Sequence, residues 1–146
     1  MRVCGIDVSS YNVDCVGISD EGDVDWTRWT LTGTDNWERT RSIASVMPDR
    51  TSEFWDDVYA IGVEVAHGPS SGVINRVVGA VLSMLPPNVL VEPWGAPKWK
   101  RKAGLPGNAS KPQIASYALS ELGPRDWPQD AFDAWGLARA TLLSLN

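Results

Sequence analysis

Apolar and polar positions fall into blocks along this chain that predict strands first and helices later. Two short runs, at 2–8 and 58–64, are almost continuously apolar, which is typical of strands buried on both faces. Residues 12–19 alternate partly between apolar and polar side chains, and residues 24–32 are rich in Trp and Thr, so each predicts a further strand. A short fifth strand is expected at 89–92.

Helical spacing of apolar residues, together with helix-start signals, marks four further segments. The expected helices span 36–47, 71–85, 110–122 and 129–145. Pro86 and Pro87 end the second of these helices. The third begins with a capping box, in which Ser110 is the N-cap and Gln113 follows three positions later. Residues 93–109, rich in proline and glycine, predict a loop.

The order of these elements predicts the topology. Three strands joined by short turns form an antiparallel unit, and the strand–helix units that follow add parallel strands. We therefore expect one α/β domain over residues 1–146, with a five-stranded mixed sheet (three antiparallel strands, then two parallel ones) flanked by helices. A chain of 146 residues is long enough for one sizeable core.

Charge is distributed unevenly along the chain. The net charge is −5, and the first 80 residues hold 13 acidic and 6 basic residues, whereas the remainder holds 5 acidic and 7 basic ones. The two cysteines, Cys4 and Cys15, fall on neighbouring predicted strands, which favours small buried apolar residues over a disulfide or metal pair. No signal peptide or membrane-spanning apolar run is present, and we expect a soluble, cytoplasmic protein.

Four carboxylates stand at structurally defined points. Asp7 lies inside the first apolar strand, Glu64 closes the fourth, and Asp130 and Asp133 share one face of the last helix because they are three positions apart. A carboxylate in an apolar strand is costly unless a cation or a hydrogen-bond donor compensates it. Taken singly, Asp7 is explained equally well, and Asp130 better, by an ordinary surface or capping acid. Together, without matching Lys or Arg nearby in the sequence, the four favour a divalent-cation site.

A basic cluster precedes the third helix. It comprises Lys98, Lys100, Arg101, Lys102 and, at the helix start, Lys111. Such a cluster suits a nucleic-acid backbone, although by itself a run this short is better explained by a solvated charged surface. Trp94 and Trp99 lie in the same segment, where a tryptophan could stack on a base; for Trp94 packing in the core is the favoured interpretation.

These residues resemble the RuvC family of Holliday junction resolvases, within the ribonuclease H-like superfamily. The resemblance covers essentially the whole chain and rests on segments that occur in the family's order: Gly5-Ile6-Asp7, Val63-Glu64, the Lys- and Gly-rich stretch 100–114, and Asp130-Ala131-Phe132-Asp133-Ala134. Two positions depart from the family pattern. Val8-Ser9 replaces Pro-Gly, and His67, the only histidine, replaces an aromatic residue.

The resemblance implies a structure-selective endonuclease that resolves Holliday junctions and related branched DNA, leaving 5′-phosphate and 3′-hydroxyl ends. It implies that Asp7, Glu64, Asp130 and Asp133 hold two Mg²⁺ ions per active site, and that Mn²⁺ can substitute for Mg²⁺. It also implies a homodimer encoded by a prokaryote or phage. Two alternatives remain open: a nuclease acting on RNA–DNA hybrids or RNA, and a catalytically inactive protein that binds branched DNA.

Overall fold

The computed structural model describes all residues, 1–146. Its strands are β1 (Arg2–Val8), β2 (Asn12–Ser19), β3 (Val24–Thr30), β4 (Val58–Glu64) and β5 (Leu90–Trp94). Its helices are α1 (Asn36–Val46), α2 (Gly72–Leu82), α3 (Ala96–Ala103), α4 (Lys111–Leu122) and α5 (Gln129–Ser144), with a single turn of 3₁₀ helix at Glu53–Trp55. None of these helices combines the length and the apolar character needed to cross a bilayer.

The five strands form one sheet in the order β3-β2-β1-β4-β5. β1 pairs antiparallel with β2, and β2 with β3, while β4 runs parallel to both β1 and β5. The mixed sheet of three antiparallel and two parallel strands expected from the sequence is therefore confirmed. β5 is displaced by one to two residues from its expected position and ends at Trp94.

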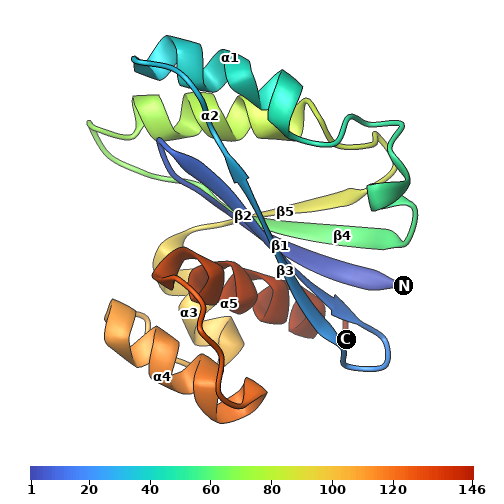
Figure 1. Cartoon of the computed structure of the whole chain (residues 1–146). Helices are drawn as coiled ribbons and strands as arrows, with labels where there is room; N and C mark the ends of the chain where they lie inside the picture. The colour runs from blue at the N-terminus through green and yellow to red at the C-terminus, as the bar shows by residue number, and fades with distance from the viewer.

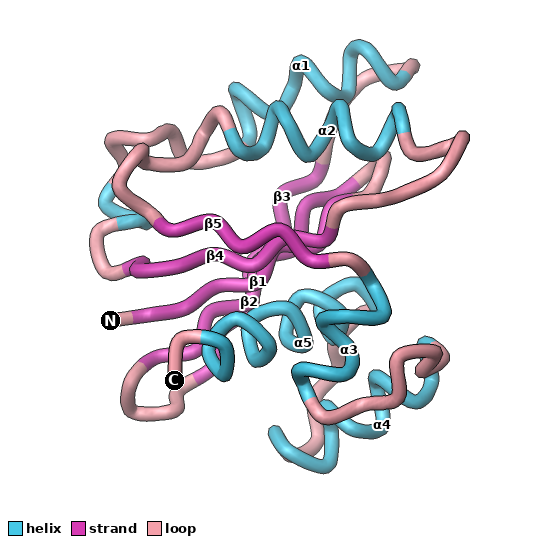
Figure 2. The backbone as a smooth tube through the Cα atoms, turned by 180° about the vertical axis from the view of Figure 1, so that it is seen from behind, coloured by secondary structure: helices cyan, strands magenta, loops and turns pink.

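Helices cover both faces of the sheet, as Figures 1 and 2 show. α1 and α2 lie on one face over a core that includes Ile6, Val13 and Ile61. α5 crosses the other face, with α3 and α4 packed outside it. Cys4 and Cys15 are buried as free thiols in the first core, as the sequence predicted.

The basic segment expected as a loop contains α3. Pro97 fits the first helical turn, where its missing N–H is not needed, and Gly104 ends the helix in the left-handed region with φ 106°. Proline and glycine therefore bound a helix here instead of marking a loop. Trp99 lies in the middle of α3 and is only 1% exposed.

α5 lies unusually close to β1, because Gly5 has no side chain. A Cβ at this position would overlap the carbonyl oxygen of Ala134 and the amide nitrogen of Ala138. The close approach sets the depth of α5 on the sheet. It also brings the N-terminal turn of α5 to the end of β1 that carries Asp7.

Candidate functional site

A row of charged side chains crosses four neighbouring strands at one end of the sheet. Asp14 on β2 lies directly opposite Asp7 on β1 and also opposite Arg28 on β3. Glu64 is the last residue of β4, the parallel neighbour of β1 on its other side. Because strand side chains alternate between faces, Asp7 points to the same face as Gly5, the face that α5 covers.

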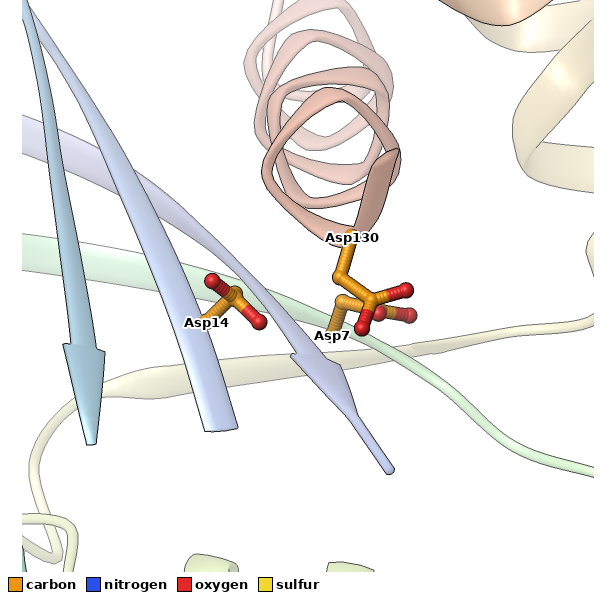
Figure 3. Close-up of side chains that lie close together, drawn as sticks. All are labelled: Asp7, Asp14 and Asp130. Atoms are coloured by element: carbon orange, nitrogen blue, oxygen red, sulfur yellow. The ribbon is translucent and has the colours of Figure 1, made fainter. Parts of the chain in front are cut away.

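The first turn of α5 adds one carboxylate to this row. Asp130 lies in that turn, and ligand oxygens of Asp7, Asp14 and Asp130 all lie within 4.8 Å of one another. Figure 3 shows their three side chains gathered between the strand ends and the start of the helix. The helix N-terminus offsets some of this negative charge through its partial positive charge.

The negative charge around Asp7 is not fully compensated. Burial raises the pKa of the Asp7 carboxyl well above its ordinary value, and the neighbouring charges of Asp133, Asp130, Glu64 and Asp14 raise it further. Like charges directly opposite each other on paired strands also destabilise a sheet. A bound divalent cation would reverse both effects, because it favours the ionised carboxylates.

The carboxylates differ in how many of their oxygens are already engaged. Glu64 accepts one hydrogen bond through Oε2, from the indole Nε1 of Trp99 at 2.8 Å. Asp133, which is 6% exposed, accepts through both oxygens, from Gln129 Nε2 at 3.1 Å and from Lys111 Nζ at 3.2 Å. Neither Asp7 nor Asp130 accepts a hydrogen bond in the structure, and Arg28 Nη2 lies 4.0 Å from Asp130 Oδ2. Asp7, Asp130 and the second oxygen of Glu64 are thus available to a cation.

The structure brings the four acids named from the sequence to one place and adds one that the sequence analysis missed. Asp14 is fully buried in the structure, but in the sequence it is only one of the polar positions of a partly alternating strand. The hairpin register of the structure pairs position 7 with position 14, whereas the expected three-residue turn at 9–11 would pair position 7 with position 13.

The basic residues named from the sequence separate into two groups. Lys111 reaches the carboxylate cluster through Asp133. Lys98, Arg101 and Lys102 are exposed on α3, whereas Lys100 is half-buried and donates to the carbonyl oxygen of Ala109 at 3.1 Å.

Trp94 and Trp99 are both buried, so base stacking, left open for them by the sequence, is excluded in this conformation. Trp94 donates to Thr141 Oγ1 at 3.0 Å, and Trp99 packs over Gly136 of α5 while it holds Glu64. Each indole links the end of a strand to a helix, and the bond from Trp99 does so at Glu64 in the carboxylate cluster.

The loop after β4 is fixed by a side chain of α2. Asn75 donates to the carbonyl oxygen of Ala66 at 2.9 Å and accepts from its amide at 3.1 Å. His67 follows, half-buried, with its ring next to Gly95. Arg76 lies over the ring of the exposed Trp37, so Asn75 and Arg76 both have structural partners.

The raised pKa of Asp7 leads to a prediction about metal-free protein. A carboxyl whose pKa is higher in the folded state contributes stability below its unfolded pKa, and that stability is lost as the pH rises toward its folded pKa. With a chelator present, we expect Asp7→Asn to raise the melting temperature by about 3 °C or more at pH 8, and by much less at pH 5. Melting curves of both proteins at several pH values test this, and a difference that does not grow with pH would contradict it.

Comparison with solved structures identifies the fold. A structure of Thermus thermophilus RuvC matches 99% of this chain and 95% of its own length, with a TM-score of 0.66 and 21% identity. T. thermophilus RuvC in complex with a Holliday junction substrate matches 99% of this chain and 94% of its own, with a TM-score of 0.69 and 17% identity. No protein-family model matches the chain, and no curated protein is significantly similar to it in sequence. The fold is that of RuvC, which confirms the ribonuclease H-like architecture expected from the sequence.

Proposed function

We propose that this chain is a metal-dependent endonuclease that cuts Holliday junctions and related branched DNA. The observation that carries the proposal is the carboxylate cluster around Asp7, whose negative charge is only partly compensated, at the sheet end where α5 begins. The RuvC fold supports it, because one structure with that fold holds a Holliday junction substrate. The products would carry 5′-phosphate and 3′-hydroxyl ends.

The donor set fits Mg²⁺. The available ligand atoms are all carboxylate oxygens, which hard cations prefer over nitrogen or sulfur ligands. Asp7 lies on the strand next to that of Glu64, and its carboxylate lies near that of Asp130; the resemblance to the RuvC family implies that Asp7 would serve both ions. Two bound Mg²⁺ ions would supply a water made nucleophilic at neutral pH and would stabilise the leaving oxygen of the phosphodiester.

The hydrogen bonds suggest different roles for the two acids of α5. We assign Asp130 as a metal ligand, because its oxygens are available next to those of Asp7. Asp133 is held by Gln129 and Lys111, and Lys111 is itself exposed at the start of α4. A DNA phosphate near Lys111 would compete with Asp133 for its ammonium group and release an oxygen of Asp133 toward a second ion.

The exposed cations of α3 would hold the DNA backbone. α3 packs against α5, so Lys98, Arg101 and Lys102 lie on a helix that contacts the element carrying Asp130. Contacts from such side chains to phosphates supply affinity and orientation but carry no base sequence. Paired cuts in a four-way junction, which is nearly two-fold symmetric, suit a homodimer acting inside a prokaryotic or phage-infected cell.

The indole of Trp99 gives a prediction about metal binding. Trp99→Phe removes the donor to Glu64, and outer groups that orient a ligand typically change metal affinity by 10–100-fold. We expect about a 10-fold weaker Mn²⁺ affinity and about 2 kcal/mol lower stability, from the lost bond to a charged group and the smaller ring. Mn²⁺ titration and urea unfolding measure both effects, with Trp37→Phe as a matched control because Trp37 is 63% exposed. Unchanged Mn²⁺ affinity would contradict the assigned role of Trp99.

A substrate comparison tests the proposed function. An end-labelled four-way DNA junction, a linear duplex of matched sequence and an RNA–DNA hybrid are incubated with the protein in Mg²⁺ and in Mn²⁺. We expect symmetric nicks near the junction centre, with the duplex left intact. Cleavage of the hybrid alone would indicate a ribonuclease H-like activity instead, and junction binding without product in either metal would indicate an inactive binding protein.

A further inference from the structure

Arg28 on β3 is the cation that the sheet itself places in the row of carboxylates. Its guanidinium binds Asp14 side-on, with Nε 3.0 Å from Oδ1 and Nη2 3.2 Å from Oδ2. Asp14 is 0% exposed and also accepts from the indole Nε1 of Trp26 at 2.8 Å. These contacts lie on adjacent paired strands, β2 and β3, so the rigid sheet fixes the guanidinium in place.

The carboxylate of Asp14 is already engaged in hydrogen bonds, through which it holds Arg28 in place. A carboxylate has about four lone-pair sites, and Asp14 uses three of them for Arg28 and Trp26. In this respect it differs from Asp7 and Asp130, although all three lie in one group of oxygens. Breaking a buried ion pair to free Asp14 for a metal would leave an unpaired guanidinium beside the cation, which is costly.

Arg28 keeps donors that Asp14 does not use. A guanidinium carries five N–H groups, of which Asp14 engages one on Nε and one on Nη2. Nη1 makes no hydrogen bond within the chain, and Nη2 lies 4.0 Å from Asp130 Oδ2, toward the carboxylate cluster. The side chain is 30% exposed, so its free edge can be reached from outside.

We propose that Arg28 is a phosphate-binding catalytic residue, which Asp14 holds side-on so that its free N–H groups contact a non-bridging oxygen of the scissile phosphodiester. The N–H groups of the planar arginine guanidinium match the geometry of phosphate oxygens. Because Arg28 is already fixed in place, its donors need not reorient as negative charge builds on the phosphoryl oxygens. The inference rests on the proposed nuclease function and adds a residue to its site. Under the simpler alternative, Arg28 only neutralises the buried charge of Asp14.

A double variant separates these two roles. Asp14→Asn combined with Arg28→Met removes one negative and one positive charge, so the net charge of the site is preserved. If Arg28 only neutralises Asp14, the double variant cuts the junction at the wild-type rate. If Arg28 contacts the phosphate, we expect single-turnover cleavage at saturating junction to fall by ~10²-fold or more, as when one fixed donor to a developing oxyanion is removed.

Two binding affinities of the double variant, for Mn²⁺ and for the junction, are measured alongside its cleavage rate. We expect the Mn²⁺ affinity of the double variant and its junction affinity in Ca²⁺ to stay within about 3-fold of wild type, because Arg28 acts on the transition state and other cations hold the DNA. Wild-type cleavage by the double variant would overturn the inference. A Mn²⁺ affinity lowered by 10-fold or more would also overturn it, since Asp14 would then be a metal ligand.

A conservative variant keeps the inference testable if the double variant does not fold. Arg28→Lys preserves the charge beside Asp14 but replaces the fork with a single ammonium group. We expect about 10-fold slower cleavage by the folded Arg28→Lys protein, and wild-type cleavage by it would overturn the inference. A wild-type protein that cuts no DNA would instead overturn the proposed function, and this inference with it.

Discussion

Replacing Asp7 with asparagine is expected to lower the single-turnover rate of junction cleavage by ~10³-fold or more. Asp7 lies between the carboxylates of β2 and β4 and faces Asp130, so a cation held by the cluster would depend on it more than on any other residue. An asparagine keeps the shape and one oxygen but supplies no negative charge. The measurement is the rate of cleavage of an end-labelled four-way junction in Mg²⁺, at protein concentrations that saturate the DNA.

The same variant should still fold and bind DNA. In the proposed function, junction binding comes from cations on α3 and α4, so in Ca²⁺ the affinity of Asp7→Asn should match or exceed that of wild type. Glu21→Gln is the matched control, because Glu21 is an exposed acid in the turn between β2 and β3, at the opposite end of β2 from Asp14. Cleavage by Asp7→Asn at the rate of this control would remove Asp7 from the active site.

Gly5→Ala is expected to cause the largest loss of stability of any single methyl group added to this chain. The new Cβ would meet backbone atoms of Ala134 and Ala138, and backbone cannot rotate away as a side chain can. α5 would have to lift off β1, which is the centre of the sheet. We expect a loss of about 3 kcal/mol or more, at the upper end of the cost of overpacking a core, and a melting temperature lower by roughly 10 °C.

Gly79→Ala provides the control for that prediction. Gly79 is exposed on α2, and a Cβ there would have no neighbour within 4 Å. Alanine is the better helix former, so this variant should gain about 0.5–1 kcal/mol. Chemical unfolding of both variants gives the two free energies, and equal stabilities would show that α5 does not rest on β1 as described.

Local pattern was sufficient to predict the sheet and most helices. The apolar runs at β1 and β4 and the capping box at Ser110 are signals that arise within a few residues, and the structure has an element at each of them. The segment at α3 was misread because Pro97 and Gly104, which bound a helix, also occur in loops. Its buried face depends on Trp99 packing against α5, a contact between distant parts of the chain.

The candidate site was only partly predictable for the same reason. Asp7, Glu64, Asp130 and Asp133 could be named because each occupies a recognisable position within its own element. Asp14 and Arg28 acquire their place only through pairing across β1, β2 and β3, and neither stands out in its own segment. The division of roles between Asp130 and Asp133 depends on which donors reach them, and Lys111 comes from a different helix.

The most direct measurement is anomalous diffraction from crystals of the protein soaked in Mn²⁺. We expect a peak at about 2.0–2.2 Å from oxygens of Asp7 and Asp130, with Glu64 completing the ligands of this ion or of a second one about 4 Å away. The peak should be absent in crystals of Asp7→Asn. Mn²⁺ found elsewhere on the chain, with the oxygens of Asp7 and Asp130 left without an ion, would contradict the assignment of this cluster as the metal centre of a nuclease.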